Sequence, residues 1–225
     1  MRNLLAAALL VSASPLAAQQ VPAPILTTPE ALDVWTHAEP QAARVTHVAL
    51  DLEVDFETRS LSGTAAIDVL AAKGTEEIVL DADGLEISSV TDAEGRPLEW
   101  LLGARDPELG SPLTVRLGGA ERILFSYRSA QDAGALQWLP PEMTAGKDRP
   151  YVFSQGQAIN NRSWIPTQDS PGIRQTWEAR LTVPGDLVAV VERDIGHRHP
   201  AHQHRRKPPD RGQLTCAPDL DVDGF

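Results

Sequence analysis

Two consecutive runs of alternating apolar and polar residues constrain the fold of this chain more than any other feature. In residues 48–56, Val, Leu, Leu, Val and Phe alternate with Ala, Asp, Glu and Asp. In residues 61–69, Leu, Gly, Ala, Ile and Val again fill every second position. A period of two is typical of a strand with one buried face. The short polar stretch between the two runs therefore predicts an antiparallel hairpin.

Further short strands are expected downstream, at residues 77–80, 85–91, 113–117, 122–127 and 176–183. Asp-Gly, Glu-Gly and Gly-Gly pairs mark turns between several of them. Repeated short strands separated by turn signals predict an all-β domain built as an antiparallel β-sandwich. Apolar residues make up 42% of the 225, which is enough for one well-cored domain with additional segments.

Charge and cysteine content exclude two classes of protein. The formal net charge of -11 argues against nucleic acid as a partner, because binding a phosphate backbone requires clustered Lys and Arg. Cys216 is the only cysteine of the chain, so the sequence has no intramolecular disulfide framework.

Residues 1–18 have the pattern of an export signal peptide. Arg2 supplies a positive start, residues 4–13 are apolar, and small residues at 14–18 resemble a cleavage site. The apolar stretch is too short to span a bilayer. We therefore expect cleavage near Ala18, a periplasmic or secreted location, and no stable membrane anchor. The alternative is a buried amino-terminal helix, which would run directly into a Pro-rich stretch and have nothing to pack against.

Two segments lack the strand pattern. Residues 19–43 are rich in Pro, Ala, Thr and Gln, and we expect an extended leader that wraps loosely onto the domain. Residues 192–225 lose the strand periodicity, and we expect an irregular, disordered tail. Four of the six histidines stand in this tail, at His197, His199, His202 and His204. Clustered imidazoles of this kind can bind zinc, copper or nickel.

The most specific signal lies in the segment from residue 134 to 184. It contains Ala-Leu-Gln-Trp-Leu at 135–139, Gly-Lys at 146–147, Ser-Gln-Gly-Gln-Ala at 154–158 and Pro-Thr-Gln-Asp-Ser-Pro at 166–171. A Ser-Gln-x-Gln-Ala stretch followed at this spacing by Pro-x-Gln-Asp-x-Pro closely resembles the amino-terminal domain of M1 zinc aminopeptidases. The branch of the family that this segment resembles includes leukotriene A-4 hydrolase and its bacterial aminopeptidase relatives. The resemblance covers about residues 44–191.

The resemblance implies a saddle-like β-sandwich that forms one wall of a substrate cleft. It implies that Gln155, Gln157 and Ala158 bind substrate, with the two carboxamides pointing into the cleft. Carboxamide oxygens accept hydrogen bonds from a peptide's free amino terminus, and the amide nitrogens donate to its carbonyls. The alternative from residue type alone is that both glutamines satisfy backbone groups inside a buried loop.

Other residues of this segment have structural interpretations. Trp138, Trp164 and Trp177 are expected to be core aromatics or to pack against a neighbouring domain. Asp169 precedes Ser-Pro, and we expect it to organise a turn rather than to perform acid–base chemistry.

The chain contains no catalytic or metal-binding residues of the family. The family's chemistry requires His-Glu-x-x-His on a helix and a later Glu as the third zinc ligand. No His-Glu-x-x-His occurs here, and Met143 is followed by Thr144 where a Gly-x-Met-Glu-Asn motif would need Glu. We therefore expect the chain alone to be inactive. Zinc, the peptide substrate and a packing partner in the form of the missing catalytic domain belong to the complete enzyme.

The tail supports a second hypothesis besides metal binding. In the family the Val-Pro-x-x-Leu-Val-Ala-Val run, here at 183–190, leads into further strands of the sandwich. In this chain the resemblance stops near residue 191. We therefore interpret residues 192–225 as translated out of frame, and the chain as a truncated form of a longer enzyme.

Three functions follow from the sequence. The first is the truncated, cleft-lining amino-terminal domain of an exported zinc aminopeptidase. The second is a stand-alone, non-catalytic β-sandwich that binds peptides or a protein, because fold alone does not fix function. The third is epoxide hydrolysis, the second activity of the eukaryotic branch, whose determinants lie mostly outside this segment.

Overall fold

Strands form nearly all the regular structure of the computed structural model, which describes residues 33–190 and 211–216. The two helices within those residues are single 3-10 turns, η1 (Pro141–Met143) and η2 (Asn161–Ser163). The all-β fold class predicted from the sequence is confirmed.

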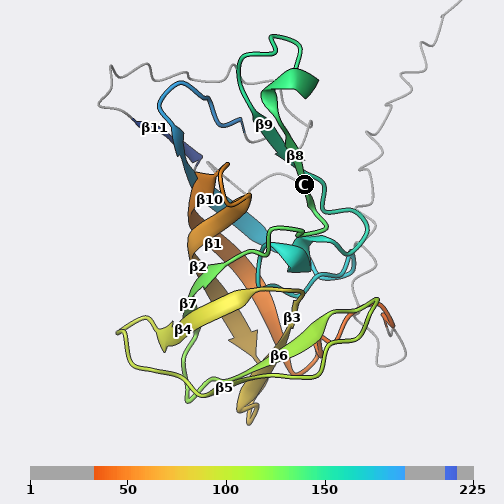
Figure 1. The fold of residues 1–225 in the computed structure, drawn as a ribbon. Coiled ribbons are helices and arrows are strands. Elements are labelled where there is room, and N and C mark those ends of the chain that lie inside the picture. Colours follow the sequence, from red (N-terminus) through yellow and green to blue (C-terminus); the bar gives the residue numbers. More distant parts are fainter. Residues whose placement is uncertain (1–32, 191–210, 217–225) are drawn as a thin grey trace, which may run out of the picture.

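The largest sheet has six strands in the order β11-β10-β1-β2-β7-β4 (Figure 1). Its strands are β1 (Ala43–Asp55), β2 (Ser60–Ala71), β4 (Glu86–Asp92), β7 (Arg122–Arg128), β10 (Thr176–Pro184) and β11 (Arg211–Cys216). A second sheet has the order β3-β6-β5 and consists of β3 (Glu77–Ala82), β6 (Ser111–Arg116) and β5 (Trp100–Leu102). A separate two-stranded ribbon pairs β8 (Leu136–Leu139) with β9 (Tyr151–Ser154). It lies at the opposite end of the molecule from β5 and β6 (Figure 1).

The expected hairpin is the pair β1 and β2, which are antiparallel along their length. The register shifts between Val45 and His47. This irregularity lets Val45 and Val48 both face the core although they are three residues apart. At Gly63, φ is +149°, and a Cβ atom would lie 2.1 Å from the Asp51 carbonyl oxygen. Only glycine therefore fits at this point of β2.

The two sheets share one hydrophobic core. The inward side chains of β3 and β6, such as Leu80 and Leu113, belong to the same buried cluster as Ile67 of β2 and Phe125 of β7. All four side chains have relative exposures of 0%. Two sheets that bury their inner faces against each other form a sandwich.

The pairing differs from the predicted antiparallel arrangement in one place. β10 runs parallel to β1, with Leu50 opposite Ala179. The alternating pattern identifies a strand but not its direction, and direction here is decided by the long path of the chain between β1 and β10.

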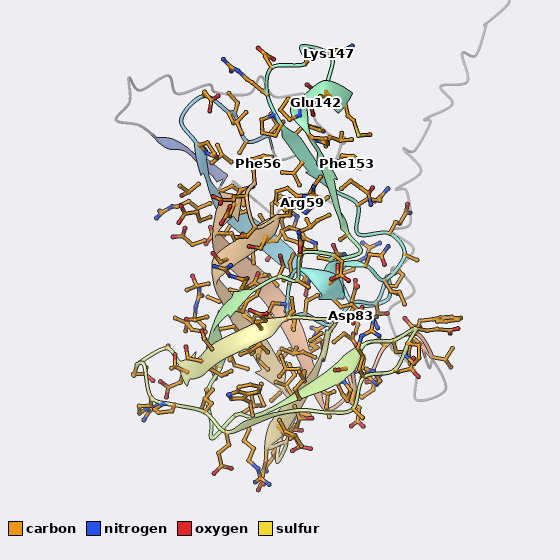
Figure 2. The ribbon with its side chains drawn as sticks, viewed as in Figure 1. Phe56, Arg59, Asp83, Glu142, Lys147 and Phe153 are labelled. Carbon is orange, nitrogen blue, oxygen red and sulfur yellow. The ribbon has the colours of Figure 1, made fainter. Side chains whose placement is uncertain are left out.

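The ribbon of β8 and β9 was not predicted. Its inner face packs on the core through Trp138, whose ring meets Phe56 edge-on with centroids 5.4 Å apart. Figure 2 shows Phe56 near the base of the ribbon and Glu142 and Lys147 at its far end. Trp164 is also partly buried against the core, whereas Trp177 is 39% exposed. Trp138 and Trp164 therefore pack against the core, and packing of Trp177 against a neighbouring domain stays a prediction.

The predicted flanking segments are described only in part. Residues 33–42 of the expected leader make specific hydrogen bonds to the domain, which is tighter than the loose wrapping we expected. The expected irregular tail contains β11, which pairs with β10. The signal peptide of residues 1–18 and the four tail histidines lie outside the described residues, so both remain predictions. Within the described part of the chain, no helix has the length and apolar character needed to cross a membrane.

Shortening a central core side chain tests the shared core. Phe125→Ala removes a fully buried ring, and we expect the free energy of unfolding to fall by about 3–5 kcal/mol. Leu101→Ala is the control, because Leu101 is 68% exposed on β5 and its loss is expected to cost less than about 0.5 kcal/mol. Urea titration measures both values. Equal effects of the two substitutions would contradict the assignment of the core.

Candidate functional site

The predicted binding residues lie in one exposed loop. We call residues 155–160, between β9 and η2, the glutamine loop. Gln155, Gln157 and Ala158 are all exposed. The alternative of glutamines hidden inside a buried loop is therefore wrong, whereas the binding role itself remains a prediction.

The backbone of the glutamine loop is held at both ends. The Gln155 amide donates to the Ala135 carbonyl oxygen at 2.8 Å, which continues the ladder of β8 and β9. The Asn160 amide donates to the Gly156 carbonyl oxygen at 2.8 Å, and its side-chain Nδ2 donates to the Gln157 carbonyl oxygen at 3.1 Å. The peptide bond between Gln157 and Ala158 is cis. The hydrogen bonds hold the backbone, while Gln155 and Gln157 remain exposed.

The glutamine carboxamides differ in what they already bind. Gln155 Oε1 accepts a long hydrogen bond of 3.4 Å from the Gln157 amide. The Gln157 carboxamide makes no hydrogen bond to any other described residue. Gln157 therefore presents both its acceptor and its donors to the surface.

Asn161 supports the loop from beneath. A Cβ atom built on Gly156 would lie 2.1 Å from Asn161 Oδ1, so the Asn161 side chain lies directly against the Gly156 backbone. Any side chain at 156 would displace Asn161. Such a displacement would disturb the hydrogen bond between Asn161 and Asp169.

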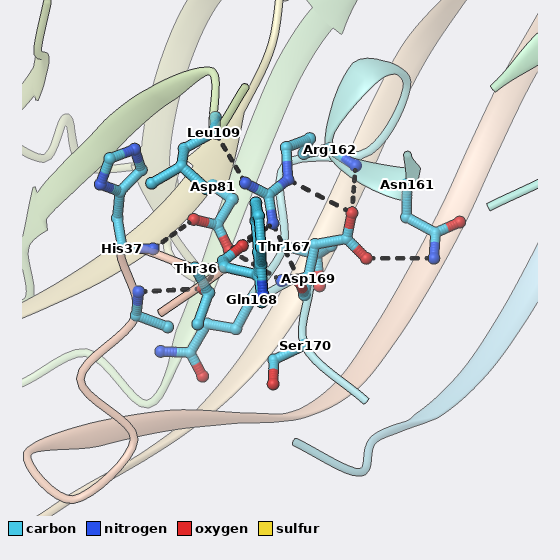
Figure 3. A network of polar contacts seen from close by, with 12 residues as sticks. Thr36, His37, Asp81, Leu109, Asn161, Arg162, Thr167, Gln168, Asp169 and Ser170 are labelled. Carbon is cyan, nitrogen blue, oxygen red and sulfur yellow. Dashed lines mark hydrogen bonds and ion pairs between the residues drawn. The ribbon is translucent and has the colours of Figure 1, made fainter. Parts of the chain in front are cut away.

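A buried ionic network lies directly behind the loop. Arg162 has a relative exposure of 2%, and it lies between Asp81 at 0% and Asp169 at 5%. Figure 3 shows the guanidinium between the two carboxylates. Arg162 Nη2 is 3.7 Å from Asp81 Oδ2, and Arg162 Nε is 3.4 Å from Asp169 Oδ2. A charge buried this deeply requires partners, because desolvation costs several kcal/mol per ion.

Each guanidinium nitrogen of Arg162 donates a hydrogen bond. Besides the contact of Nε with Asp169, Nη1 donates to the Leu109 carbonyl oxygen at 2.6 Å. Nη2 donates to the Trp35 carbonyl oxygen at 2.7 Å and to the Asp169 carbonyl oxygen at 3.0 Å. One side chain thus joins three segments that are far apart in the sequence: the amino-terminal segment, the turn before β6, and the strand-free stretch before β10.

The Asp81 carboxylate accepts hydrogen bonds from two of these segments, the amino-terminal segment and the stretch before β10. Its carboxylate accepts from the His37 amide at 2.7 Å, from the Thr36 hydroxyl, and from the Asp169 amide at 2.9 Å. Asp169 also binds the residue that follows the loop, because its Oδ1 accepts from Asn161 Nδ2 at 3.2 Å. The expectation that Asp169 has a structural role is consistent with these contacts.

Gln168 ties the network to both sheets. Its Oε1 accepts from the Val45 amide at 2.9 Å, and its Nε2 donates to the carbonyl oxygens of Ala43 at 2.9 Å and Val79 at 3.1 Å. The buried Gln and Asp of the Pro-x-Gln-Asp-x-Pro motif therefore act as connectors between β1, β3 and η2. In the sequence this motif was a family signature only, and the buried network was not predicted from it.

The electrostatics of the network are set by burial. Burial raises the pKa of the Asp169 carboxyl above its ordinary value, and the Arg162 amide and guanidinium partly oppose this change. One cation compensates two carboxylates, so the loss of Arg162 would leave two buried anions without their cation.

The chain does not supply a zinc site of the family's type. The sequence lacks His-Glu-x-x-His. In residues 33–190 and 211–216, no three His, Cys, Asp or Glu side chains come together as a metal site would require. No step of zinc chemistry is therefore assigned to these residues.

Comparison with known proteins agrees with the motifs. The family model described as Peptidase M1 N-terminal domain matches residues 44–206, which extends beyond residue 191 where we expected the resemblance to end. Leucine aminopeptidase 2 of Sclerotinia sclerotiorum is 34% identical, with 65% of this chain and 25% of the relative aligned. Leukotriene A-4 hydrolase of Xenopus laevis is 33% identical, with 71% of this chain and 27% of the relative aligned.

The fold agrees with a solved relative. Native leukotriene A4 hydrolase from Saccharomyces cerevisiae superposes with a TM-score of 0.65 at 28% identity. The superposition covers 70% of this chain and 26% of that protein. The chain thus spans about a quarter of the length of the relatives that it matches.

Removing the buried cation tests the network. Arg162→Met leaves Asp81 and Asp169 buried and unpaired, and we expect the free energy of unfolding to fall by about 3–5 kcal/mol. Arg180→Met is the matched control, because Arg180 is half exposed where it meets Asp51 and its loss should cost less than about 1 kcal/mol. Urea titration measures both. A loss below about 1 kcal/mol for Arg162→Met would contradict the network.

The ionisation of Asp169 gives a second test. We expect carbon-13 NMR titration to give a pKa above the ordinary value, and a still higher pKa in Arg162→Met, where the opposing charge is gone. Because the folded pKa exceeds the unfolded one, ionised Asp169 lowers stability at neutral pH. This penalty disappears as the pH falls through the raised pKa. A pKa at or below the ordinary value would show that burial does not control this carboxyl.

Proposed function

The chain belongs to the M1 peptidase family through its amino-terminal domain, and from this premise we propose that it lines the substrate cleft of a zinc-dependent aminopeptidase. In the complete enzyme this domain binds the amino-terminal end of a peptide through Gln155, Gln157 and Ala158. Hydrolysis takes place at zinc ligands of the His-Glu-x-x-His type, which do not occur in these 225 residues.

The observation that carries the proposal is an exposed pair of glutamines on a rigid base. Neutral carboxamides orient an ammonium group without titrating themselves. The Gln157 backbone is hydrogen-bonded to Asn160, and the loop is supported by Asn161. Pre-organised groups lose less entropy on binding, so a fixed loop favours recognition of a short, polar peptide end.

The proposal includes location and partners. An exported enzyme, periplasmic or secreted, agrees with the pattern of residues 1–18. The packing partner is the catalytic polypeptide of a longer protein, in agreement with relatives about four times as long as the aligned part of this chain. Zinc is supplied by that polypeptide, and nucleic acid is not a partner.

A chimaera tests the proposal. Residues 33–190 would replace the matching amino-terminal part of the Saccharomyces cerevisiae relative, and hydrolysis of aminoacyl substrates would be measured. We expect Gln157→Ala to lower kcat/KM by about tenfold to a hundredfold, because a hydrogen bond to a charged group contributes about 1.5–3 kcal/mol. Gln131→Ala, an exposed glutamine outside the loop, is the control and should leave kcat/KM unchanged.

Two results would redirect the proposal. An active chimaera whose kcat/KM does not respond to Gln157→Ala would remove the glutamine loop from the cleft. Tight binding of free-amino-terminal peptides by the 225-residue chain alone, lost in Gln157→Ala, would favour the stand-alone binding module instead.

A further inference from the structure

We propose that Arg162 is a positioning residue through which the amino-terminal segment 33–37 holds the glutamine loop in its binding conformation. We call residues 33–37 the strap. The functional consequence of this coupling depends on the function proposed above, whereas the coupling itself is a property of the chain alone.

The first link joins the buried arginine to the loop. The two carboxylate oxygens of Asp169 accept from different donors. Oδ1 accepts from Asn161 Nδ2 at 3.2 Å, and Oδ2 accepts from the Arg162 amide at 3.1 Å. Asn161 in turn lies against Gly156, between the two glutamines. The position of Gly156 therefore depends on the Asp169 carboxylate, and the carboxylate is held by Arg162.

The second link joins the arginine to the strap. Arg162 Nη2 donates to the Trp35 carbonyl oxygen at 2.7 Å. Asp81, which faces the same guanidinium, binds the Thr36 hydroxyl and the His37 amide. Together these contacts attach the strap to the buried network.

The strap is held by polar contacts rather than by apolar burial. Val34 is 71% exposed and Trp35 is 51% exposed, so neither side chain anchors the strap in the core. The contacts that remain are the bonds to Arg162 and Asp81 and the bond between the Ser170 hydroxyl and Asp33. Losing a few hydrogen bonds is therefore sufficient to release the strap, and its release exposes the guanidinium that fixes the loop.

The coupling predicts that release of the strap destabilises the hydrogen bonds at the glutamine loop and η2. When the strap is released, water reaches Arg162 and Asp81, their mutual attraction weakens, and Asp169 and Asn161 are held less firmly. The amides of Asn160 and Ser163, which are hydrogen-bonded to the Gly156 and Asn160 carbonyls, then open more often. The paired strands β1, β2 and β7 do not depend on the strap and keep their protection.

Hydrogen exchange of the full chain tests this coupling. Thr36→Val with His37→Pro removes both strap donors to Asp81 without changing any loop residue. We expect exchange of the Asn160 and Ser163 amides to accelerate about tenfold or more, which corresponds to about 1.4 kcal/mol, with no change in the amides of β2. Restoring the hydroxyl and the amide donor with Thr36→Ser and wild-type His37 should return the loop to slow exchange.

A matched control removes a threonine hydroxyl elsewhere. Thr58→Val breaks the Thr58–Ser60 hydrogen bond in the β1–β2 turn and should leave loop exchange unchanged. Unchanged loop exchange in the strap variant would overturn the proposal. Equal acceleration in the loop and in β2 would also overturn it, because the strap would then contribute only to global stability.

The outcome is separable from the proposed function. Hydrogen exchange needs no peptide, so it reports the coupling even if the glutamines bind nothing. A strap variant that loosens the loop, together with a chimaera insensitive to Gln157→Ala, would leave the coupling intact and reject the cleft role. Unchanged loop exchange in the strap variant, together with a chimaera whose kcat/KM falls in Gln157→Ala, would reject only the coupling.

Discussion

The buried guanidinium of Arg162 is the interaction on which the rest of the site depends. It joins the strap, the turn before β6 and the stretch before β10 at one point, through hydrogen bonds to Trp35, Leu109 and Asp169. A planar group with donors in fixed directions suits this task better than a flexible ammonium. Because the charge is desolvated, each partner is needed to compensate the cost of burying it. These contacts also fix the geometry of the glutamine loop, which directly precedes η2.

The division between scaffold and loop follows from this arrangement. The sandwich buries the apolar faces of both sheets, and Gln168 connects β1 with β3 by hydrogen bonds to Val45, Ala43 and Val79. The glutamine loop stands outside that core and is exposed. A recognition loop on a rigid base is the usual solution when binding residues must stay accessible and well positioned.

The sequence predicted those strands in which apolar and polar residues alternate. The hairpin of β1 and β2 was predicted because every second residue is apolar, and the binding role of the loop residues is a prediction from the family motif. β5 was missed because Trp100–Leu102 are all exposed and show no alternation. The Arg162 network was missed because Arg is rarely buried and its partner Asp81 is distant in the sequence, so no local pattern marks it. The parallel pairing of β10 with β1 likewise depends on the chain path rather than on composition.

The most direct test of this account is the NMR behaviour of the Arg162 guanidinium in the intact chain at neutral pH. A side chain with 3% exposure whose nitrogens all donate should give a resolved Nε–H signal that exchanges slowly with water, and distinct Nη signals because rotation is blocked. A fast-exchanging Nε–H with averaged Nη signals would mean that the guanidinium is solvated. The strap, the network and the fixed glutamine loop would then lose their common support.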